Sequence, residues 1–414
     1  MLVRRTRSGR RNAEAAAATL LGLLLVGGAA VPAHAEGMRG QQWFLDAMKA
    51  EQMWRTSTGK GMTVAVLDTG VDAGNPDLQG QVLRGKDFAV GKPGNEQTDY
   101  DGHGTGMAGL IAATGAANGG NGTYGLAPGT KILPVRLPDP TVAPNEAAAA
   151  TQFNQVLPKA LRYAVDAGAR IINISMAQDE SSPAVTAAVK YALQKGSLVF
   201  AGAGNKGDKG NPVQYPAATP GVIGVAAVGK SLRRATWSEY GSQVDMAAPG
   251  EDMVAACTSK TGFCKGYGTS DATAIASASA ALIWSVHPKW TNNQVLRVML
   301  NTIGAPTNGA KRNDSIGYGI VRPRIALLSP GDPGPADVYP LPDLAVAGPA
   351  SPKGTASAPT SAKQPAGQEK TVGGPARSDG GDGMLWTGLG VGAVVIAGGI
   401  AVAVAFARRR RSAT

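Results

Sequence analysis

The sequence predicts an α/β domain with a parallel central sheet and helices on both faces. Short, almost continuously apolar runs alternate with helical stretches, the pattern of strands that are buried on both sides. Residues 36–328 are also numerous enough for one sizeable core. The expected strands are Thr63–Leu67, Lys131–Arg136, Ile171–Ser175, Leu198–Gly202 and Val222–Val228. The expected helices are Gly104–Thr114, Lys159–Ala167, Pro183–Lys195, Asp271–Val286 and a last one that follows the capping box Thr291–Gln294 and ends at Leu300.

The N-terminal segment, residues 1–35, is typical of an export signal. Five arginines precede an apolar stretch from Ala15 to Val31, and an A-x-A pattern ends at Ala35, where we expect cleavage. An uncleaved anchor is the alternative, because 17 apolar residues lie near the lower limit for spanning a bilayer. Residues 36–60 then form an extension before the first expected strand.

The C-terminal part predicts a membrane anchor. Residues 329–384 are rich in Pro, Gly and Ala and lack apolar periodicity, as in a disordered stalk. Residues 385–407 form an uncharged run of 23 residues, long enough for a transmembrane helix; a buried soluble helix is the alternative. The basic tail, residues 408–414, begins with four arginines and should stay in the cytoplasm. We therefore expect a single-pass protein of the cell membrane with an extracytoplasmic globular domain.

The net charge of +11 does not indicate a nucleic-acid partner. Nine arginines and one glutamate lie in residues 1–35 and 408–414, which leaves only +3 for the rest of the chain. A basic face for phosphate binding needs a larger local excess of Lys and Arg.

Cys257 and Cys264 are the only cysteines. In an exported protein this pair predicts a disulfide. Two cysteines without histidine neighbours make a poor zinc site, and no clustered carboxylate loop specifies calcium. We expect no cofactor and no metal.

One segment, Pro138–Thr151, has no place in the alternation of strands and helices. Its three prolines and its alanine run predict a surface insertion. Whether it covers the functional cleft stays open at this stage.

Three separated side chains have the order Asp, His, Ser of a nucleophilic triad. Asp68 closes an expected strand, His103 lies in the glycine-rich turn 101–106, and Ser270 follows a Gly-Thr pair before a helix of small residues. A serine hydroxyl is a weak nucleophile and needs an adjacent base, whose tautomer an aspartate can hold. This order is one of three unrelated orders known for the chemistry.

The alternatives for the individual residues are weaker than this combination. His34 lies in the export signal and His287 precedes a proline, so His103 is the best placed of the chain's three histidines. By itself, a histidine before a helix could simply cap it. Asp99 and Asp101 rival Asp68, but Asp101 lies only two residues from His103 and is poorly placed to reach the ring nitrogen that faces away from the serine.

Asn205 adds a fourth chemical group. It ends the segment Ala201–Asn205, where an expected strand runs into glycines and presents one amide side chain. An asparagine amide can donate to the oxyanion of a tetrahedral intermediate. Asparagine is also a common turn former, which explains Asn205 by itself but not its occurrence together with the three triad residues.

These motifs resemble those of the subtilisin-like serine proteases, the subtilases of peptidase family S8. The segment Val64–Gly70 matches the aspartate motif, 101–105 the histidine motif and 268–270 the serine motif. The resemblance covers about 290 of the 414 residues and implies a subtilisin-like fold and a polypeptide substrate. It also implies substrate contacts from Ser175, Met176, Ala177 and Gly202, and Ala177 stands where relatives usually carry glycine. Subtilases often bind calcium through scattered groups.

More narrowly, the chain resembles the mycosins, membrane-anchored subtilases of type VII secretion. The segment Trp43–Trp54 and the order of signal, stalk, membrane helix and basic tail carry this resemblance. It implies a processing protease with membrane proteins of the secretion machinery as partners. The alternative is a structural stabiliser of a secretion complex with weak or incidental proteolysis. An esterase or peptide ligase that uses the same site is a further alternative.

Overall fold

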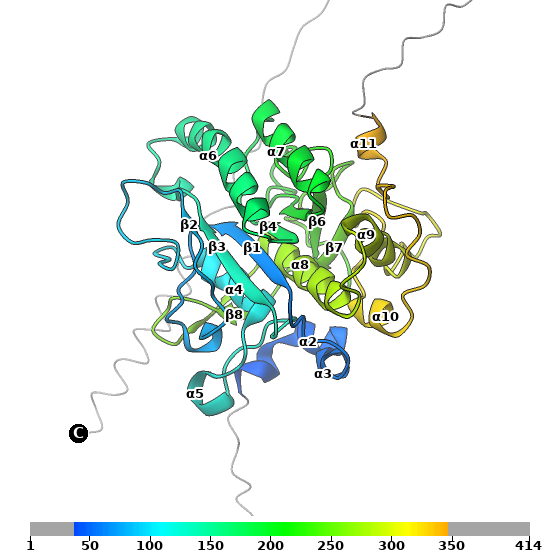
Figure 1. Cartoon of the computed structure of the whole chain (residues 1–414), viewed down its shortest axis with the longest axis horizontal. Coiled ribbons are helices and arrows are strands. Elements are labelled where there is room, and N and C mark those ends of the chain that lie inside the picture. The colour runs from blue at the N-terminus through cyan, green and yellow to red at the C-terminus, as the bar shows by residue number, and fades with distance from the viewer. Residues whose placement is uncertain (1–36, 347–414) are drawn as a thin grey trace, which may run out of the picture. The chain divides into compact units, whose positions relative to one another are not determined.

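A computed structural model describes residues 37–346, which form an α/β unit around a seven-stranded parallel sheet (Figure 1). The strand order is β2-β3-β1-β4-β5-β6-β7. The predicted signal, the membrane helix, the basic tail and most of the predicted stalk lie outside the described residues. The strands of the sheet are β1 (Thr63–Asp68), β2 (Lys86–Asp87), β3 (Lys131–Arg136), β4 (Ile171–Ile174), β5 (Leu198–Gly202), β6 (Ile223–Val228) and β7 (Met246–Pro249). The predicted α/β class with a parallel sheet is confirmed.

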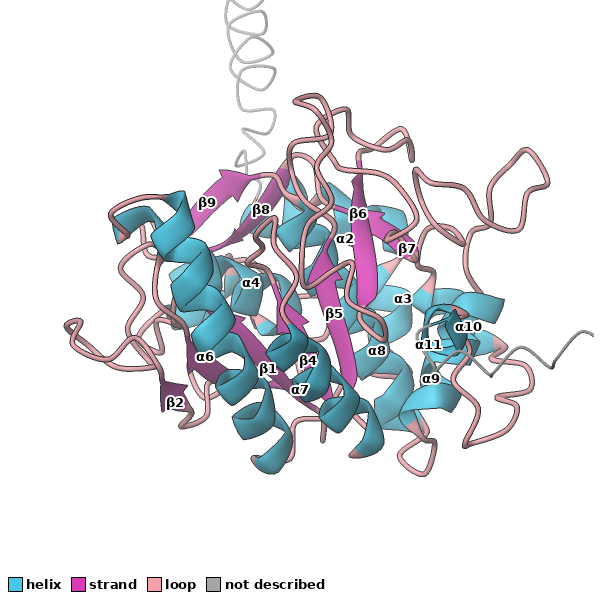
Figure 2. Cartoon of the chain, turned by 90° about the horizontal axis from the view of Figure 1, so that it is seen from above, coloured by secondary structure: helices cyan, strands magenta, loops and turns pink. Residues whose placement is uncertain are grey.

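Helices cover both faces of this sheet (Figure 2). α4 and α8 pack on one face, together with α2, α3, α9 and α10, whereas α6 and α7 pack on the other. The α-helices are α2 (Trp43–Met48), α3 (Ala50–Trp54), α4 (His103–Ala112), α5 (Ala117–Gly120), α6 (Glu146–Asp166), α7 (Pro183–Gln194), α8 (Thr269–Val286), α9 (Asn292–Asn301), α10 (Pro323–Leu328) and α11 (Asp343–Val346). Short 3-10 helices are η1 (Met38–Gln41), η2 (Pro76–Leu78) and η3 (Pro140–Val142).

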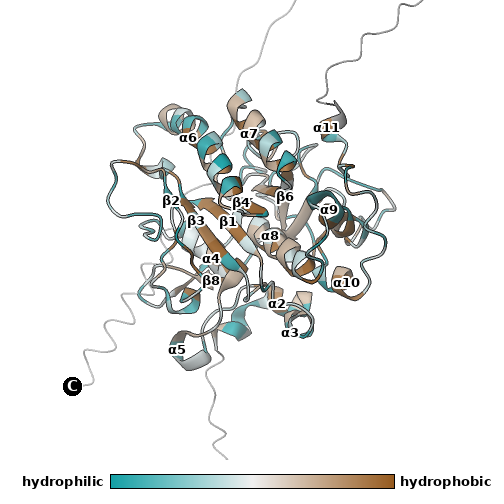
Figure 3. Ribbon diagram, viewed as in Figure 1, coloured by the Kyte–Doolittle hydropathy of each residue, from teal (hydrophilic) through white to brown (hydrophobic). Residues whose placement is uncertain are grey.

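The continuous apolar runs of the sequence are explained by this two-sided cover. In β1, Val64 and Val66 pack into the core on the α4 and α8 side, whereas Ala65 and Leu67 pack against α6 and α7. Successive strand residues point to opposite faces, so both sets must be apolar. Figure 3 shows the result as brown central strands, β1 and β3, beside an α6 that carries teal.

Helix α8 runs through the core and is buried along almost its whole length, from Thr269 to Trp284. Its alanines and serines let neighbouring backbones approach closely, which a helix of larger side chains would prevent. At its end Trp284 donates to the carbonyl of Trp290, and the guanidinium of Arg170 lies 3.9 Å from the Trp284 ring. His287 stacks on Trp290, so this histidine has a structural role.

The predicted insertion Pro138–Thr151 needs a correction. Its second half is the start of α6, which begins at Glu146 behind an Asn145 cap and continues through Pro158. The sequence predicted this helix only from Lys159, because an interior proline usually ends or kinks a helix. Packing of the α6 apolar face on the sheet outweighs that cost here.

The structure also adds a two-stranded antiparallel hairpin, β8 (Met253–Ala256) with β9 (Phe263–Gly266). Neither strand was predicted. β9 is largely exposed, so it lacks the apolar alternation that marks a strand in the sequence.

The boundary predicted at Ser329 is too early. Residues 329–346 pack on the domain: Arg297 donates to the carbonyls of Pro333, Pro335 and Val338, and Leu341 is only 3% exposed. A segment rich in proline has few backbone N–H groups that can donate hydrogen bonds. The guanidinium of Arg297 supplies donors to three of its carbonyls. We call residues 329–346 the C-terminal strap.

Among the described residues, no helix is both long and apolar enough to cross a membrane.

Candidate active site

The predicted functional residues come together at the carboxyl ends of the central strands. Asp68 ends β1, Ser175 follows β4, and Asn205 follows β5. His103 and Ser270 lie in the first turns of the buried helices α4 and α8. Functional groups in parallel sheets gather at this edge because the loops there are free to diverge while the strands hold them in place.

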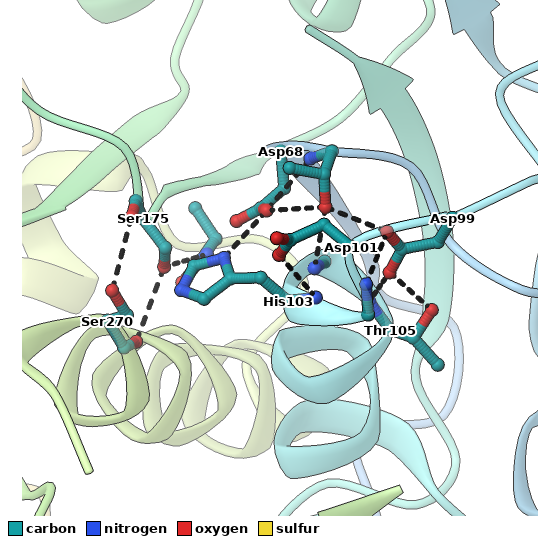
Figure 4. A network of polar contacts seen from close by, with 11 residues as sticks. Asp68, Asp99, Asp101, His103, Thr105, Ser175 and Ser270 are labelled. Atoms are coloured by element: carbon teal, nitrogen blue, oxygen red, sulfur yellow. Dashed lines mark hydrogen bonds and ion pairs between the residues drawn. The ribbon is translucent and has the colours of Figure 1, made fainter. Parts of the chain in front are cut away.

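Asp68 and His103 form a short, directed pair (Figure 4). The Nδ1 atom of His103 lies 2.7 Å from Oδ1 of Asp68, whose side chain is fully buried. The same oxygen accepts from the backbone N–H of Thr69 at 2.8 Å. Because Nδ1 faces a carboxylate, the neutral imidazole carries its proton on Nδ1 and its lone pair on Nε2, which can accept a proton.

The histidine turn is held by Asp99, which sequence reasoning considered only as a rival of Asp68. Its carboxylate accepts from the N–H of Gly102, from the N–H and hydroxyl of Thr105, and from the Thr69 hydroxyl, at 2.7–2.9 Å. The signal for this role was an aspartate three residues before a glycine turn, since short acidic side chains cap nearby backbone donors. Asp101 bonds the backbone N–H of His103 and not its ring.

The environment strongly favours protonated His103. Burial is the largest single influence and opposes the charge. The charge and hydrogen bond of Asp68, with the charges of Asp271 and Asp101, outweigh it and raise the pKa of His103 to about 9. Burial in turn raises the pKa of Asp271 to about 7.

Ser270 lies beside this pair, but its hydroxyl points to another acceptor. It donates to the carbonyl of Ser175 at 3.1 Å, and the Ser175 hydroxyl donates back to the Ser270 carbonyl at 3.3 Å. Ser175 also accepts from Asn173, which accepts from Ser277 of α8. This chain of contacts fixes the end of β4 against the start of α8. Rotation about the Ser270 Cα–Cβ bond redirects the hydroxyl, and catalytic hydrogen bonds often close only when substrate binds.

The side-chain amide of Asn205 is oriented by Thr269. Its Oδ1 accepts from the N–H and the hydroxyl of Thr269, at 2.9 and 3.0 Å. The Thr269 hydroxyl also accepts from the N–H of Gly204. With Oδ1 engaged, the Nδ2 donor of Asn205 remains for a ligand. The sequence shows Thr269 only as part of the serine motif, because its contact with Asn205 exists only where α8 and the end of β5 meet in the fold.

These groups line one cleft of about 820 Å³. His103, Asn205 and Ser270 contribute to it, and so do three predicted substrate contacts, Ser175, Met176 and Ala177. Residues from Pro138 to Ala150 form part of the wall of this cleft, so the predicted insertion borders the functional site. Gly202 differs from the prediction. It is buried behind Thr269, where a Cβ atom would lie 2.8 Å from the threonine hydroxyl, and it does not line the cleft.

Cys257 and Cys264 form a disulfide across the β8–β9 turn. The side chain of Asn75 donates to the carbonyls of Cys257 and Gly262 and ties this turn to the domain. The hairpin leads directly into the approach to Ser270. No group of three or more His, Cys, Asp or Glu residues suited to a metal ion occurs in residues 37–346.

Comparisons with known proteins agree with this geometry. A model of the subtilase family matches residues 59–319. The chain is 37% identical over 248 residues to a thermophilic serine proteinase of Bacillus sp. (strain AK1), a match that covers 60% of this chain and 58% of that relative. The chain thus spans less than two thirds of the length of this relative.

Solved structures give the same picture. The crystal structure of MycP1 from Mycobacterium smegmatis is similar with a TM-score of 0.63 and 26% identity, covering 74% of this chain and 89% of that one. Another MycP1 structure, of a serine protease described as an essential component of the type VII (ESX-1) secretion system, has a TM-score of 0.62 and 31% identity. It covers 72% of this chain and 90% of that one.

Proposed function

Because the chain belongs to the subtilase family of serine peptidases, we propose that it is an endopeptidase that cleaves polypeptides through an acyl-enzyme on Ser270. The observation that carries the proposal is the Asp68–His103 pair at 2.7 Å in the cleft that also contains Ser270 and Asn205. A buried carboxylate, an imidazole, a hydroxyl and an amide donor are the four groups that acyl transfer to serine requires.

The reaction begins when the Ser270 hydroxyl turns from the Ser175 carbonyl toward Nε2 of His103. His103 removes the proton as Oγ attacks the scissile carbonyl carbon, and Asp68 stabilises the imidazolium. The Nδ2 group of Asn205 and the backbone N–H of Ser270 donate to the developing oxyanion. His103 then protonates the leaving amine. Water, deprotonated by the same imidazole, hydrolyses the ester and restores Ser270.

A serine-directed fluorophosphonate probe tests this activity. The probe should form a covalent bond to Ser270 in the wild-type chain and should leave Ser270→Ala unlabelled. Wild-type protein should also cleave an unfolded polypeptide at internal bonds. Turnover of small esters without any internal cleavage of polypeptides would instead favour an esterase or a peptide ligase.

We further propose that the enzyme is exported and tethered to the cell membrane by residues 385–407, with the catalytic domain outside and the tail 408–414 in the cytoplasm. The uncharged run of 23 residues before four arginines supports this arrangement. Full-length protein should sediment with membranes, and a chain that ends at Asp382 should not. External protease should degrade the catalytic domain on intact cells but spare an epitope placed on the basic tail.

The likeness to MycP1 supports a role at a type VII secretion machinery, with its membrane proteins as partners. The competing role is structural stabilisation of a secretion complex. Ser270→Ala separates the two, because it removes the nucleophile without changing the outer surface. Secretion that persists when cleavage stops would assign the dominant role to the scaffold, whereas loss of both would assign it to proteolysis.

A further inference from the structure

A buried glutamate that the mechanism does not use lies next to the oxyanion donor. Glu239 is 0% exposed and follows β6 in a loop that reaches back to the end of β5. A fully buried carboxyl group is costly unless it is hydrogen-bonded, so its contacts are informative.

Those contacts bracket Asn205 on both sides. The side chain of Glu239 accepts from the backbone N–H of Lys206 at 3.0 Å, and its own backbone N–H donates to the carbonyl of Gly204 at 2.9 Å. The residues before and after Asn205 are therefore both attached to Glu239.

The approach of the carboxyl group to this loop is very close. Gly204 has φ +118°, and a Cβ atom there would lie 2.2 Å from Oε2 of Glu239. Oε2 itself is buried without a hydrogen-bond partner in the described residues. Glycine at this position thus lets the carboxyl group lie against the backbone of the loop.

We propose that Glu239 is a positioning residue that holds the Asn205 side chain in the geometry for oxyanion stabilisation. This inference rests on the proposed peptidase function. Thr269 donates to Oδ1 of Asn205 and so orients the side-chain amide, and Glu239 holds the backbone on both sides of Asn205. Together they leave Nδ2 as a donor whose direction is set before substrate arrives, which is the condition for effective oxyanion stabilisation.

The proposed positioning of Asn205 does not depend on the charge of the Glu239 side chain. Burial raises the pKa of Glu239 to about 7, with the Lys206 N–H opposing and the charge of Asp179 adding to the shift. Both the protonated and the ionised form offer an acceptor oxygen to Lys206. A neutral amide in the same place should therefore serve almost as well.

The test compares three substitutions with a chromogenic peptide substrate. Glu239→Ala removes the acceptor, and Glu239→Asp withdraws it by one methylene. Both should lower kcat about tenfold, a fraction of the roughly 10²–10³ that loss of an oxyanion donor costs, with KM nearly unchanged. Glu239→Gln keeps the acceptor and should recover most of kcat. If Glu239→Ala does not fold, Glu239→Asp against Glu239→Gln decides the question.

A double substitution establishes whether Glu239 acts through Asn205. In an Asn205→Ala background, Glu239→Asp should cause almost no further loss of kcat, because the group it positions is already absent. Equal losses in both backgrounds, a change confined to KM, or wild-type kcat in Glu239→Asp would overturn the inference. Absence of any Ser270-dependent cleavage by the wild-type chain would contradict the proposed function instead.

Discussion

At the scale of single residues, Gly104 beside the catalytic pair is required because the backbones of α4 and of the segment after β1 lie very close together there. A Cβ atom on Gly104 would lie 2.1 Å from the carbonyl oxygen of Gly70 and 3.0 Å from Cβ of Asp68. Any larger residue at 104 would push α4, and the His103 imidazole with it, away from β1. The histidine motif therefore needs glycine at position 104 for packing.

Replacement of Asp68 by asparagine should lower kcat about 10⁴-fold and leave the fold intact, because the amide no longer holds the correct tautomer of His103. Steady-state kinetics measure the effect, and circular dichroism verifies the fold. Asp101→Asn is the matched control: its carboxylate bonds the backbone N–H of His103, so it should lose far less. Equal losses in the two variants would argue against an orienting role of Asp68.

The pH profile should reflect the raised pKa of His103, about 9. Only neutral imidazole accepts the serine proton, so kcat/KM should rise as pH increases through that value. The stabilisation from the Asp68–His103 pair has the opposite dependence. It is fully present below the unfolded pKa of about 6.5 and is lost as pH rises through about 9.

Asp271→Asn supplies the control for this profile. It removes one of the charges that raise the pKa of His103, so the midpoint of kcat/KM should move to lower pH. A profile that stays unchanged in this variant would show that Asp271 does not act on the imidazole.

At the scale of elements, the β8–β9 hairpin depends on its crosslink. β9 is mostly exposed, and the hairpin gains little from apolar burial of that strand. The Cys257–Cys264 disulfide closes the hairpin turn, and Asn75 attaches that turn to the domain. Because the hairpin precedes the segment that carries Ser270, loosening it should affect both stability and turnover.

Substitution of both Cys257 and Cys264 by serine should lower the free energy of unfolding by about 2.5 kcal/mol at most, the loop-closure value for eight residues. The melting temperature should fall by a few degrees, as followed by calorimetry. Reductant should lower the melting temperature of the wild-type chain similarly and should not affect the variant. A variant as stable as wild type would indicate that Asn75 alone is sufficient to hold the turn.

At the scale of the whole described domain, the C-terminal strap, residues 329–346, closes the molecule over α9. The side chain of Asp343 accepts from the N–H of Gly221, just before β6, and Arg297 binds three strap carbonyls. The strap thus connects α9 to the loop before β6, two parts of the domain that are not paired in the sheet.

A chain that ends at Leu328 should be less stable than one that ends at Val346 by about 3 kcal/mol, since it loses the burial of Leu341 and several hydrogen bonds. Urea unfolding of the two chains measures the difference. Arg297→Gln in the longer chain should reproduce part of the loss. If both chains have the same stability, the strap does not contribute to the fold.

The sequence by itself predicted five of the seven strands of the sheet, the five longest α-helices of the described residues and the candidate triad. Apolar runs, glycine turns and small-residue helices are local signals, and the order of Asp68, His103 and Ser270 restricts the chemistry. Its errors lie where distant contacts override local preference. Packing on the sheet keeps α6 continuous through Pro158, and hydrogen bonds from Arg297 hold the proline-rich strap on the domain.

Only the tertiary structure decided which groups support the catalytic residues. Lys206 and Glu239 are 33 residues apart, and Asn205 and Thr269 are 64 apart. Neither spacing has a period that a sequence pattern would reveal. The same holds for the direction of the Ser270 hydroxyl, which depends on Ser175 at the end of another strand. Hydrogen bonds between loops are set by where the strands place those loops, and that placement exists only in the folded chain.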